Sequence, residues 1–295
     1  MLLVYWALGK VLYYISLLFN LRHKRKASKI KELGKIHLIY RISDAGYKKV
    51  KPDYINNKNC LINALTHFAP EAIDWTIICD NCSKATMDMI YEAAHHFHLR
   101  DEQIKTVSEG DGAKTFRIAL NIALNYESND IVYFLENDYI HRSGSADALK
   151  RAFMKFPDAK FVSLYDHFDK YEDDYFWSII NLRSKVYFDG ANHWRSTNST
   201  TMTFAARVST LKKYKRIFLR YTNSAPPRDN LMFLNLDLEL ANTMLFVPIP
   251  SFSTHGETKY LAPVIDWREE NCSTLNEYEQ KTGNKNLYGN SHTKI

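Results

Sequence analysis

The stretch Asp130-Ile131-Val132-Tyr133-Phe134-Leu135-Glu136-Asn137-Asp138-Tyr139 decides the fold of this chain. Its run of β-branched and aromatic residues, 131–135, is typical of a strand buried on both faces. The strand ends in two carboxylates, and the carboxyl ends of strands in open α/β sheets form the crevice that binds ligands. Two acids there suit a hard divalent cation, which in turn suits a diphosphate. The alternative is a strand followed by an ordinary polar turn.

Around this stretch, strand-like and helix-like segments alternate. Apolar runs predict strands over 36–40, 75–79, 104–107, 161–165 and 244–248, and helical periodicity predicts helices over 59–68, 84–97, 113–126, 145–156 and from 228 onward. The predicted N-cap of the second of these helices is Ser83. This alternation predicts an α/β fold with three α/β/α layers and a mostly parallel central sheet. We interpret the aromatic and charged region 166–227 as insertions on that sheet.

Composition indicates a globular protein with one large α/β domain or two small ones, because the 295 residues are 45% hydrophobic and 14% aromatic. The net charge of +6 is unevenly spread, with a basic cluster over 22–35, and we expect no nucleic-acid partner. Cys79 and Cys82 form a C-x-x-C, but no second pair lies at zinc-finger spacing. The lack of a disulfide framework is consistent with a reducing cytoplasm.

The two ends are predicted to lie outside a main domain of residues 34–270. Residues 2–21 are largely apolar and just long enough to cross a bilayer, but Lys10 near their middle costs roughly 2.5–3.5 kcal/mol there. We therefore favour membrane association of 1–33 through a surface helix and a basic segment, with the rest of the chain cytoplasmic. The alternatives are a full span, or a helix packed on the domain or on a second subunit of a homo-oligomer. Residues 271–295 are expected to form a polar C-terminal tail.

Two further segments are candidates for ligand contacts in the same crevice. Asp80 ends the second predicted strand, either as a turn residue or as an acceptor for a base or ribose. The segment 110–117 enters a long helix, where backbone amides with Lys114 and Arg117 suit a phosphate. Its spacing matches neither a P-loop nor a dinucleotide fingerprint, so the motif is weak by itself.

The second half of the chain adds an acid and a histidine. Asp229 opens a helix directly after Pro226 and Pro227, where it acts either as a cap or as a base at the mouth of the crevice. His255 follows the strand 244–248 in a polar loop, either as a structural residue or as a metal ligand.

The order and spacing of these residues resemble the nucleotide-sugar-dependent glycosyltransferases of the GT-A fold, particularly the family 2 group. Those enzymes carry Gly…Asn, an apolar strand and Asp-x-Asp, then a Glu-Asp pair opening a helix, a strand ending in Pro, and a histidine. The matching positions here are Gly112, Asn121, 131–135, Glu136 to Asp138, Arg228-Asp229, Pro248 and His255. The resemblance covers about residues 34–257. Glu136 and Arg228 depart from the pattern, and the second departure leaves Asp237 and Glu239 as backup bases.

The resemblance implies an inverting transfer of a sugar from a nucleotide-diphosphate donor to a hydroxyl of a saccharide or lipid-linked acceptor. It implies Mn²⁺ or Mg²⁺ held by Asp138, by Glu136 directly or through water, and by His255, with Asp229 as the base. An imidazole ligand favours Mn²⁺. The implied donor-binding residues are Lys114 or Arg117 at the phosphates and Asp80, Asp44 and Asn137 elsewhere on the donor.

The aromatic insertion offers walls for the acceptor, with core packing as the alternative for each: Tyr187, Phe188, His193 and Trp194. A membrane-associated N-terminus fits a lipid-linked saccharide or a growing surface polysaccharide.

Three other functions remain open: a retaining transferase on the same fold, a sugar-phosphate nucleotidylyltransferase, and a catalytically inactive binding protein. The nucleotidylyltransferase requires a glycine-rich, basic signature near the first strand, which 40–43 does not supply.

Overall fold

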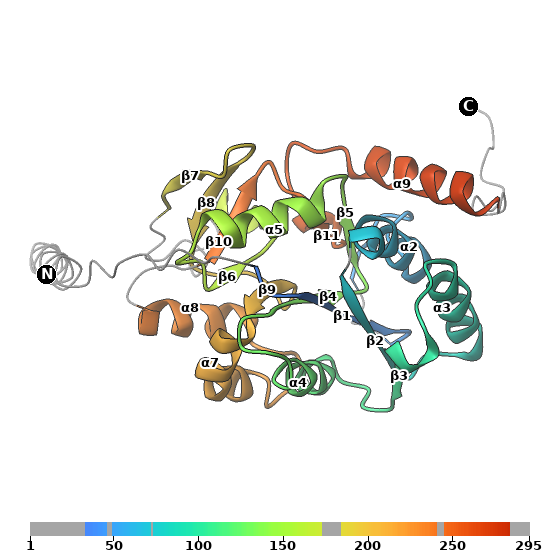
Figure 1. Ribbon diagram of the computed structural model, residues 1–295, viewed down its shortest axis with the longest axis horizontal. Coiled ribbons are helices and arrows are strands. Elements are labelled where there is room, and N and C mark those ends of the chain that lie inside the picture. Colours follow the sequence, from blue (N-terminus) through green and yellow to red (C-terminus); the bar gives the residue numbers. More distant parts are fainter. Residues whose placement is uncertain (1–32, 46–48, 72, 173–183, 241–244, 284–295) are drawn as a thin grey trace, which may run out of the picture.

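A nine-stranded sheet forms the centre of the computed structural model, which describes residues 33–45, 49–71, 73–172, 184–240 and 245–283 (Figure 1). Its strand order is β3-β2-β1-β4-β9-β6-β10-β8-β7. The strands are β1 (Ile36–Ser43), β2 (Asp74–Asp80), β3 (Ile104–Val107), β4 (Ile131–Glu136), β6 (Phe161–Val162), β7 (Val186–Phe188), β8 (His193–Thr197), β9 (Phe204–Arg207) and β10 (Leu245–Ile249). β1 to β4 run parallel to one another, and β9 and β8 run against the common direction.

Strand β4 is buried on both faces, as its apolar run predicts. Ile131, Tyr133 and Leu135 belong to one hydrophobic cluster, and Val132 and Phe134 belong to another on the opposite face. Because successive side chains of a strand point to opposite faces of the sheet, this single apolar segment contributes residues to two separate cores.

Helices cover both faces of the sheet. The first core packs beneath α2 (Asn57–Phe68), α3 (Lys84–His96), α5 (Ser145–Lys155) and α9 (Trp267–Thr282), and the second packs against α4 (Gly112–Ala123), α7 (Val208–Tyr221) and α8 (Asp229–Leu240). Figure 1 shows the two groups of helices on opposite sides of the sheet. The predicted three-layer α/β/α fold is confirmed.

Helix starts follow the capping residues of the sequence. Ser83 caps α3, because its side chain accepts the backbone N–H of Thr86, as predicted. Asp111 caps α4 by accepting the N–H of Ala113 at 2.7 Å. These caps fix where the two helices begin beside the carboxyl ends of β2 and β3.

The insertion region contributes strands to the main sheet that the sequence patterns did not predict. β9 lies between β4 and β6 and pairs antiparallel with both, and β8 pairs antiparallel with β10. β8 reads His-Trp-Arg-Ser-Thr, and the apolar part of β9 is only Phe-Ala-Ala, so neither has an apolar run long enough to mark a strand. The interpretation as insertions on the same sheet, rather than a separate domain, agrees with this pairing.

The segment expected as a polar tail from residue 271 contains most of α9. Trp267, Asn271, Leu275 and Tyr278 are buried, at a spacing that places one face of the helix on the domain. The helix ends where Gly283 adopts a left-handed φ of 67°, a conformation that glycine adopts without strain. The main domain therefore continues to the end of α9.

The proposed membrane segment 1–33 lies almost wholly outside the described residues. Within the described ranges, no helix combines the length and the apolar character needed to cross a bilayer.

Candidate active site

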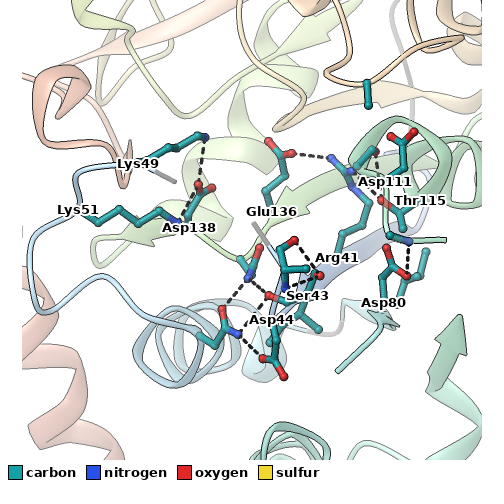
Figure 2. A pocket seen from close by; sticks show the side chains of 18 residues that line it. Arg41, Ser43, Asp44, Lys49, Lys51, Asp80, Asp111, Thr115, Glu136 and Asp138 are labelled. Carbon is teal, nitrogen blue, oxygen red and sulfur yellow. Dashed lines mark hydrogen bonds and ion pairs between the residues drawn. The ribbon is translucent and has the colours of Figure 1, made fainter. Parts of the chain in front are cut away.

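A pocket of about 640 Å³ opens at the carboxyl ends of β1, β2 and β4 (Figure 2). This is the position expected for a ligand crevice in an α/β sheet. Its lining comes from the ends of β1, β2 and β4, from the loop after β1, and from the starts of α2 and α4. The lining residues include Arg41, Ser43, Asp44, Lys49, Lys51, Asn57, Asp80, Asp111, Gly112, Thr115, Glu136, Asn137 and Asp138.

Asp80 reaches the pocket, but its carboxylate also holds a loop in place. One carboxylate oxygen accepts the backbone N–H groups of Glu109 at 2.7 Å and Gly110 at 3.1 Å. These bonds fix the segment between β3 and α4 against β2. Asp80 is therefore a positioned wall of the pocket.

Asp44 plays a similar part at the start of α3. It accepts the N–H of Ser83 at 2.6 Å, the hydroxyl of Thr86 at 2.7 Å and the amide of Asn57 at 3.1 Å. Burial alone raises the pKa of the carboxyl, but these hydrogen bonds outweigh it and hold the pKa below its ordinary value. Asn137 donates to the Asn57 side chain at 2.6 Å, so an amide network joins β4 to α2.

A buried arginine holds Glu136. Arg41 and Glu136 are partners in the parallel register of β1 and β4, so their side chains project from the same face of the sheet. The Arg41 guanidinium lies 3.0 Å from the Glu136 carboxylate and also donates to the backbone carbonyl of Gly112 at 2.9 Å. Glu136 is thus an ion-pair partner of a strand arginine.

A small second sheet brings His255 to Asp138. β5 (Tyr139–His141) follows Asp138 directly and pairs antiparallel with β11 (Ser253–His255), with His255 opposite Tyr139. His255 Nε2 lies 3.4 Å from Asp138 Oδ2. His255 therefore lies in a buried strand, and the expectation of a polar loop is wrong.

Gly256 permits this close approach. A Cβ at this position would lie 2.4 Å from Cγ2 of Ile55 and 2.8 Å from the backbone oxygen of Asp138. Both distances are shorter than real Cβ contacts. A side chain at 256 would thus force β11 away from Asp138.

Two lysines complete this end of the pocket. The ammonium groups of Lys49 and Lys51 lie 3.5 and 3.3 Å from the same Asp138 oxygen, and Lys49 lies 3.1 Å from His255 Nε2 (Figure 2 shows the two lysines on Asp138). Burial of Asp138 raises its pKa, but His255, Lys49 and Lys51 together bring the pKa well below its ordinary value. Asp138 is therefore an ionised carboxylate among cations.

Asp229 has the opposite electrostatic environment. It is half-buried at the first position of α8 and accepts the N–H of Asn230. Burial raises its pKa to about 6, and the charge of Glu136 adds to the rise against the effects of the Asn230 N–H, His255 and Lys49. Asp229 is thus close enough to the Asp138 end of the pocket to respond to its charges. The backup acids Asp237 and Glu239 lie further along α8.

Both predicted phosphate cations lie away from the pocket lining. Lys114 is 58% exposed and 3.8 Å from Glu109. Arg117 donates to the backbone carbonyl of Leu219 and to the hydroxyl of Thr222, so it ties α4 to α7.

The predicted acceptor walls lie on the β7–β8 hairpin at the far edge of the sheet. Trp194 is fully buried and donates its indole N–H to Asp189 at 2.9 Å, which is core packing. Tyr187 packs on Phe246, whereas His193 and Phe188 are exposed and contact each other. None of these four residues lines the pocket on β1, β2 and β4.

Sequence reasoning missed three cations of the site: Arg41, Lys49 and Lys51. A charged residue inside an otherwise apolar strand was one available signal, because buried arginine requires a partner. The lysines of Lys48-Lys49-Val50-Lys51 were another, since they follow the first strand at the ligand-binding edge of the sheet.

The described residues do not form the expected three-ligand metal centre. Asp138 and His255 lie together, but the carboxylate of Glu136 faces Arg41. In the part of the chain that the structure describes, no three side chains among histidine, cysteine, aspartate and glutamate are grouped to hold a metal ion. The Lys49 ammonium already contacts both Asp138 and His255. We therefore assign no chemical step to a metal ion.

Comparisons with known proteins find similarity in structure only. No protein-family model and no curated protein matches the chain. Similar solved structures include the galactosyltransferase LgtC in complex with donor and acceptor sugar analogues, with 14% identity, 83% of this chain and 99% of that chain covered, and a TM-score of 0.43. Glucosyl-3-phosphoglycerate synthase from Mycobacterium tuberculosis, in complex with Mg²⁺ and uridine diphosphate, is 9% identical, with 85% of this chain and 80% of that chain covered and a TM-score of 0.47. The 4-diphosphocytidyl-2C-methyl-D-erythritol synthase from Anaerococcus prevotii is 12% identical, with 84% of this chain and 96% of that chain covered and a TM-score of 0.43. Similarity at this level concerns the arrangement of the chain alone.

Proposed function

We propose that this protein is a glycosyltransferase that moves a sugar from a nucleotide-diphosphate donor to a hydroxyl group of an acceptor, with inversion at the anomeric carbon. One observation carries the proposal. Asp229, a half-buried carboxyl with a pKa of about 6, does not line the pocket itself, but it is near enough to Glu136, His255 and Lys49 at the Asp138 end for their charges to shift its pKa. A base next to a diphosphate-binding end is the arrangement that glycosyl transfer requires.

The pocket has two chemically different ends. Asp44, Asp80 and Asn137 line one side, where carboxylate and amide groups suit the hydroxyl and N–H groups of a nucleoside. Lys49 and Lys51 line the Asp138 end, where ammonium groups suit phosphate oxygens. The volume of about 640 Å³ falls within the usual range for small-molecule sites.

Asp229 supplies the base. As the acceptor oxygen attacks the anomeric carbon, its proton passes to the Asp229 carboxylate, and the bond from the anomeric carbon to the phosphate oxygen breaks. A pKa of about 6 leaves this carboxylate ionised at neutral pH and makes it a stronger base than an exposed aspartate. Its charge also offsets the positive charge that develops on the sugar ring.

The use of Mn²⁺ or Mg²⁺ stays a prediction from sequence, and the ion pair of Glu136 with Arg41 counts against it. A saccharide or lipid-linked acceptor from surface polysaccharide synthesis, the cytoplasmic location, membrane association through 1–33 and homo-oligomer formation are further predictions from sequence. Of the three predicted metal ligands, Asp138 and His255 are the two that the geometry keeps together.

The proposal is tested by incubating the purified protein with a panel of nucleotide sugars and measuring the release of nucleoside diphosphate. We expect release from at least one donor, and none from that donor with the Asp229→Asn variant. NMR of the glycosylated product then gives its anomeric configuration. A product that keeps the anomeric configuration of the donor would show a retaining transferase instead of an inverting one. Release of pyrophosphate from a nucleoside triphosphate and a sugar phosphate, in place of transfer, would contradict the proposal.

A further inference from the structure

We propose that Lys49 and Lys51, rather than a divalent metal ion, bind the diphosphate of the donor and receive its negative charge when the sugar departs. The inference rests on the proposed function and names the groups that serve the leaving nucleotide. Asp138 and His255 are then positioning residues that hold the lysines at the pocket.

The first support is the meeting of two ammonium groups at one carboxylate oxygen. Lys49 and Lys51 lie 3.5 and 3.3 Å from Asp138 Oδ2, and both side chains line the pocket (Figure 2). Asp138 is the carboxylate in contact with both, while Glu136 and Glu257 act on Lys49 from further away. The two ammonium groups lie at the pocket wall, where an anionic ligand can reach them.

The second support is the position of the Lys49 ammonium. It lies 3.5 Å from Asp138 Oδ2 and 3.1 Å from His255 Nε2, which are 3.4 Å from each other, so it contacts both groups that would otherwise be ligands of one metal ion. The charge of a cation is therefore already supplied at this place by the chain itself. The lysine side chains are 28% and 31% exposed, which leaves the ammonium groups accessible to a ligand.

The third support is the state of Glu136. Its carboxylate lies 3.0 Å from Arg41, whose side chain is 6% exposed and is also anchored to the backbone of α4. A metal ion would have to take Glu136 from a buried arginine, leaving that charge without its partner, which is costly. The carboxylate most needed as a third metal ligand thus has a structural partner.

The lysines fit the chemistry of the departing group. The bond between the anomeric carbon and the terminal phosphate oxygen breaks, and the oxygen keeps the electron pair. The new negative charge on the diphosphate faces the two ammonium groups, which keep their protons. The acceptor oxygen bonds to the anomeric carbon, and its proton passes to Asp229. No further reactant is required.

The test measures nucleotide binding to the protein of residues 1–295 by titration calorimetry, once with EDTA and once with Mn²⁺. The probes are UDP, GDP, CDP, ADP and dTDP and the corresponding monophosphates. The variants are Lys49→Met and Lys51→Met, with Lys155→Met at the exposed end of α5 as the matched loss of charge away from the pocket. Lys49→Arg keeps the positive charge and tests rescue.

We expect one diphosphate to bind equally well with EDTA and with Mn²⁺. A lost charge-assisted contact weakens binding about 10-fold to 100-fold, so each methionine variant should lower diphosphate affinity by this factor. Monophosphate affinity should change little, Lys49→Arg should retain most of the diphosphate affinity, and Lys155→Met should behave as the unmodified protein. Together, these outcomes would separate phosphate recognition from a general structural effect.

Binding of a diphosphate that disappears in EDTA and returns with Mn²⁺ would overturn the inference and leave the proposed function standing. So would methionine variants that fold and bind the diphosphate normally. If no nucleotide binds under either condition, the inference and the proposed function both fail.

Discussion

Replacing Asp229 by Asn should stabilise the folded protein while it abolishes sugar transfer. The carboxyl has an ordinary pKa of 3.8 and a pKa of about 6 in the folded protein, because burial disfavours its ionised form. Asn keeps the side-chain oxygen that accepts the N–H of Asn230, so the start of α8 should be unchanged. The variant removes the cost of a buried charge and, with it, the base.

The magnitude depends on pH in a defined direction. At pH 4 the carboxyl is protonated in the folded chain and about half ionised in the unfolded chain, so the variant gains only a small part of the full effect, and well below pH 3.8 it gains nothing. Above about pH 6 the folded protein carries the ionised form at a cost of up to about 3 kcal/mol for this pKa difference. Asp229 keeps some contact with water, so we expect a gain of about 1–2 kcal/mol at pH 7.5.

Urea denaturation of both proteins at pH 4 and pH 7.5 measures this gain. The matched control is Asp147→Asn, which removes an exposed acid from the first turn of α5 and should give no gain at pH 7.5. A variant at position 229 that is equally stable or less stable than the parent at pH 7.5 would refute the reasoning that Asp229 is held at an energetic cost.

The same pKa predicts the pH profile of the unmodified enzyme. Only the ionised carboxylate accepts the proton of the acceptor, so turnover should fall about tenfold from its plateau when the pH drops to 5. An ordinary aspartate would leave turnover nearly unchanged at that pH. A flat profile between pH 5 and 7 would contradict the assignment of Asp229 as the base.

Three further substitutions test the surrounding structure. Arg41→Met leaves Glu136 without its cation and should cost about 3 kcal/mol, the low end for a buried ion pair because Glu136 is 29% exposed; a urea midpoint equal to that of the parent would count against the pair. Gly256→Ala places a Cβ 2.8 Å from the Asp138 backbone oxygen and should cost about 1–3 kcal/mol by overpacking, seen as a lower Tm; an unchanged Tm would show that β11 shifts freely. Trp194→Phe loses a buried hydrogen bond and should cost about 1–2 kcal/mol with an unchanged KM for the acceptor; a raised KM would instead return Trp194 to the acceptor site.

The sequence predicted the helices and strands whose apolar residues or capping residues form a clear pattern within a short stretch of chain. The apolar run 131–135 and the cap at Ser83 are local signals, and both agree with the structure. Strand β9 has only four residues and pairs on both sides with strands distant in the chain, so its position depends on contacts that no local pattern contains.

At the site, the sequence predicted which acidic residues lie near one another, but it did not predict the cationic side chains that contact them. The spacing of Asp138, Asp229 and His255 suggested one site, whereas the ion pair of Arg41 with Glu136 depends on the register of two parallel strands. Arg117 shows how rotation about a helix matters. Thr115 lines the pocket, but a residue two positions later lies about 200° around α4, and Arg117 faces α7 instead.

The β5–β11 sheet has a consequence for the protein during its synthesis. Lys49 and His255, which meet at the Asp138 end of the pocket, are 206 positions apart in the chain. At about 5–20 residues per second, a ribosome needs roughly 10–40 s to pass from one to the other. Between residues 138 and 229, a span of roughly 5–18 s at this rate, the nascent chain holds β1, β2 and β4 but lacks both β11 and the helix that begins with Asp229. If Asp229 is the base, as proposed, a growing chain that bound a nucleotide sugar in this interval could not yet transfer the sugar.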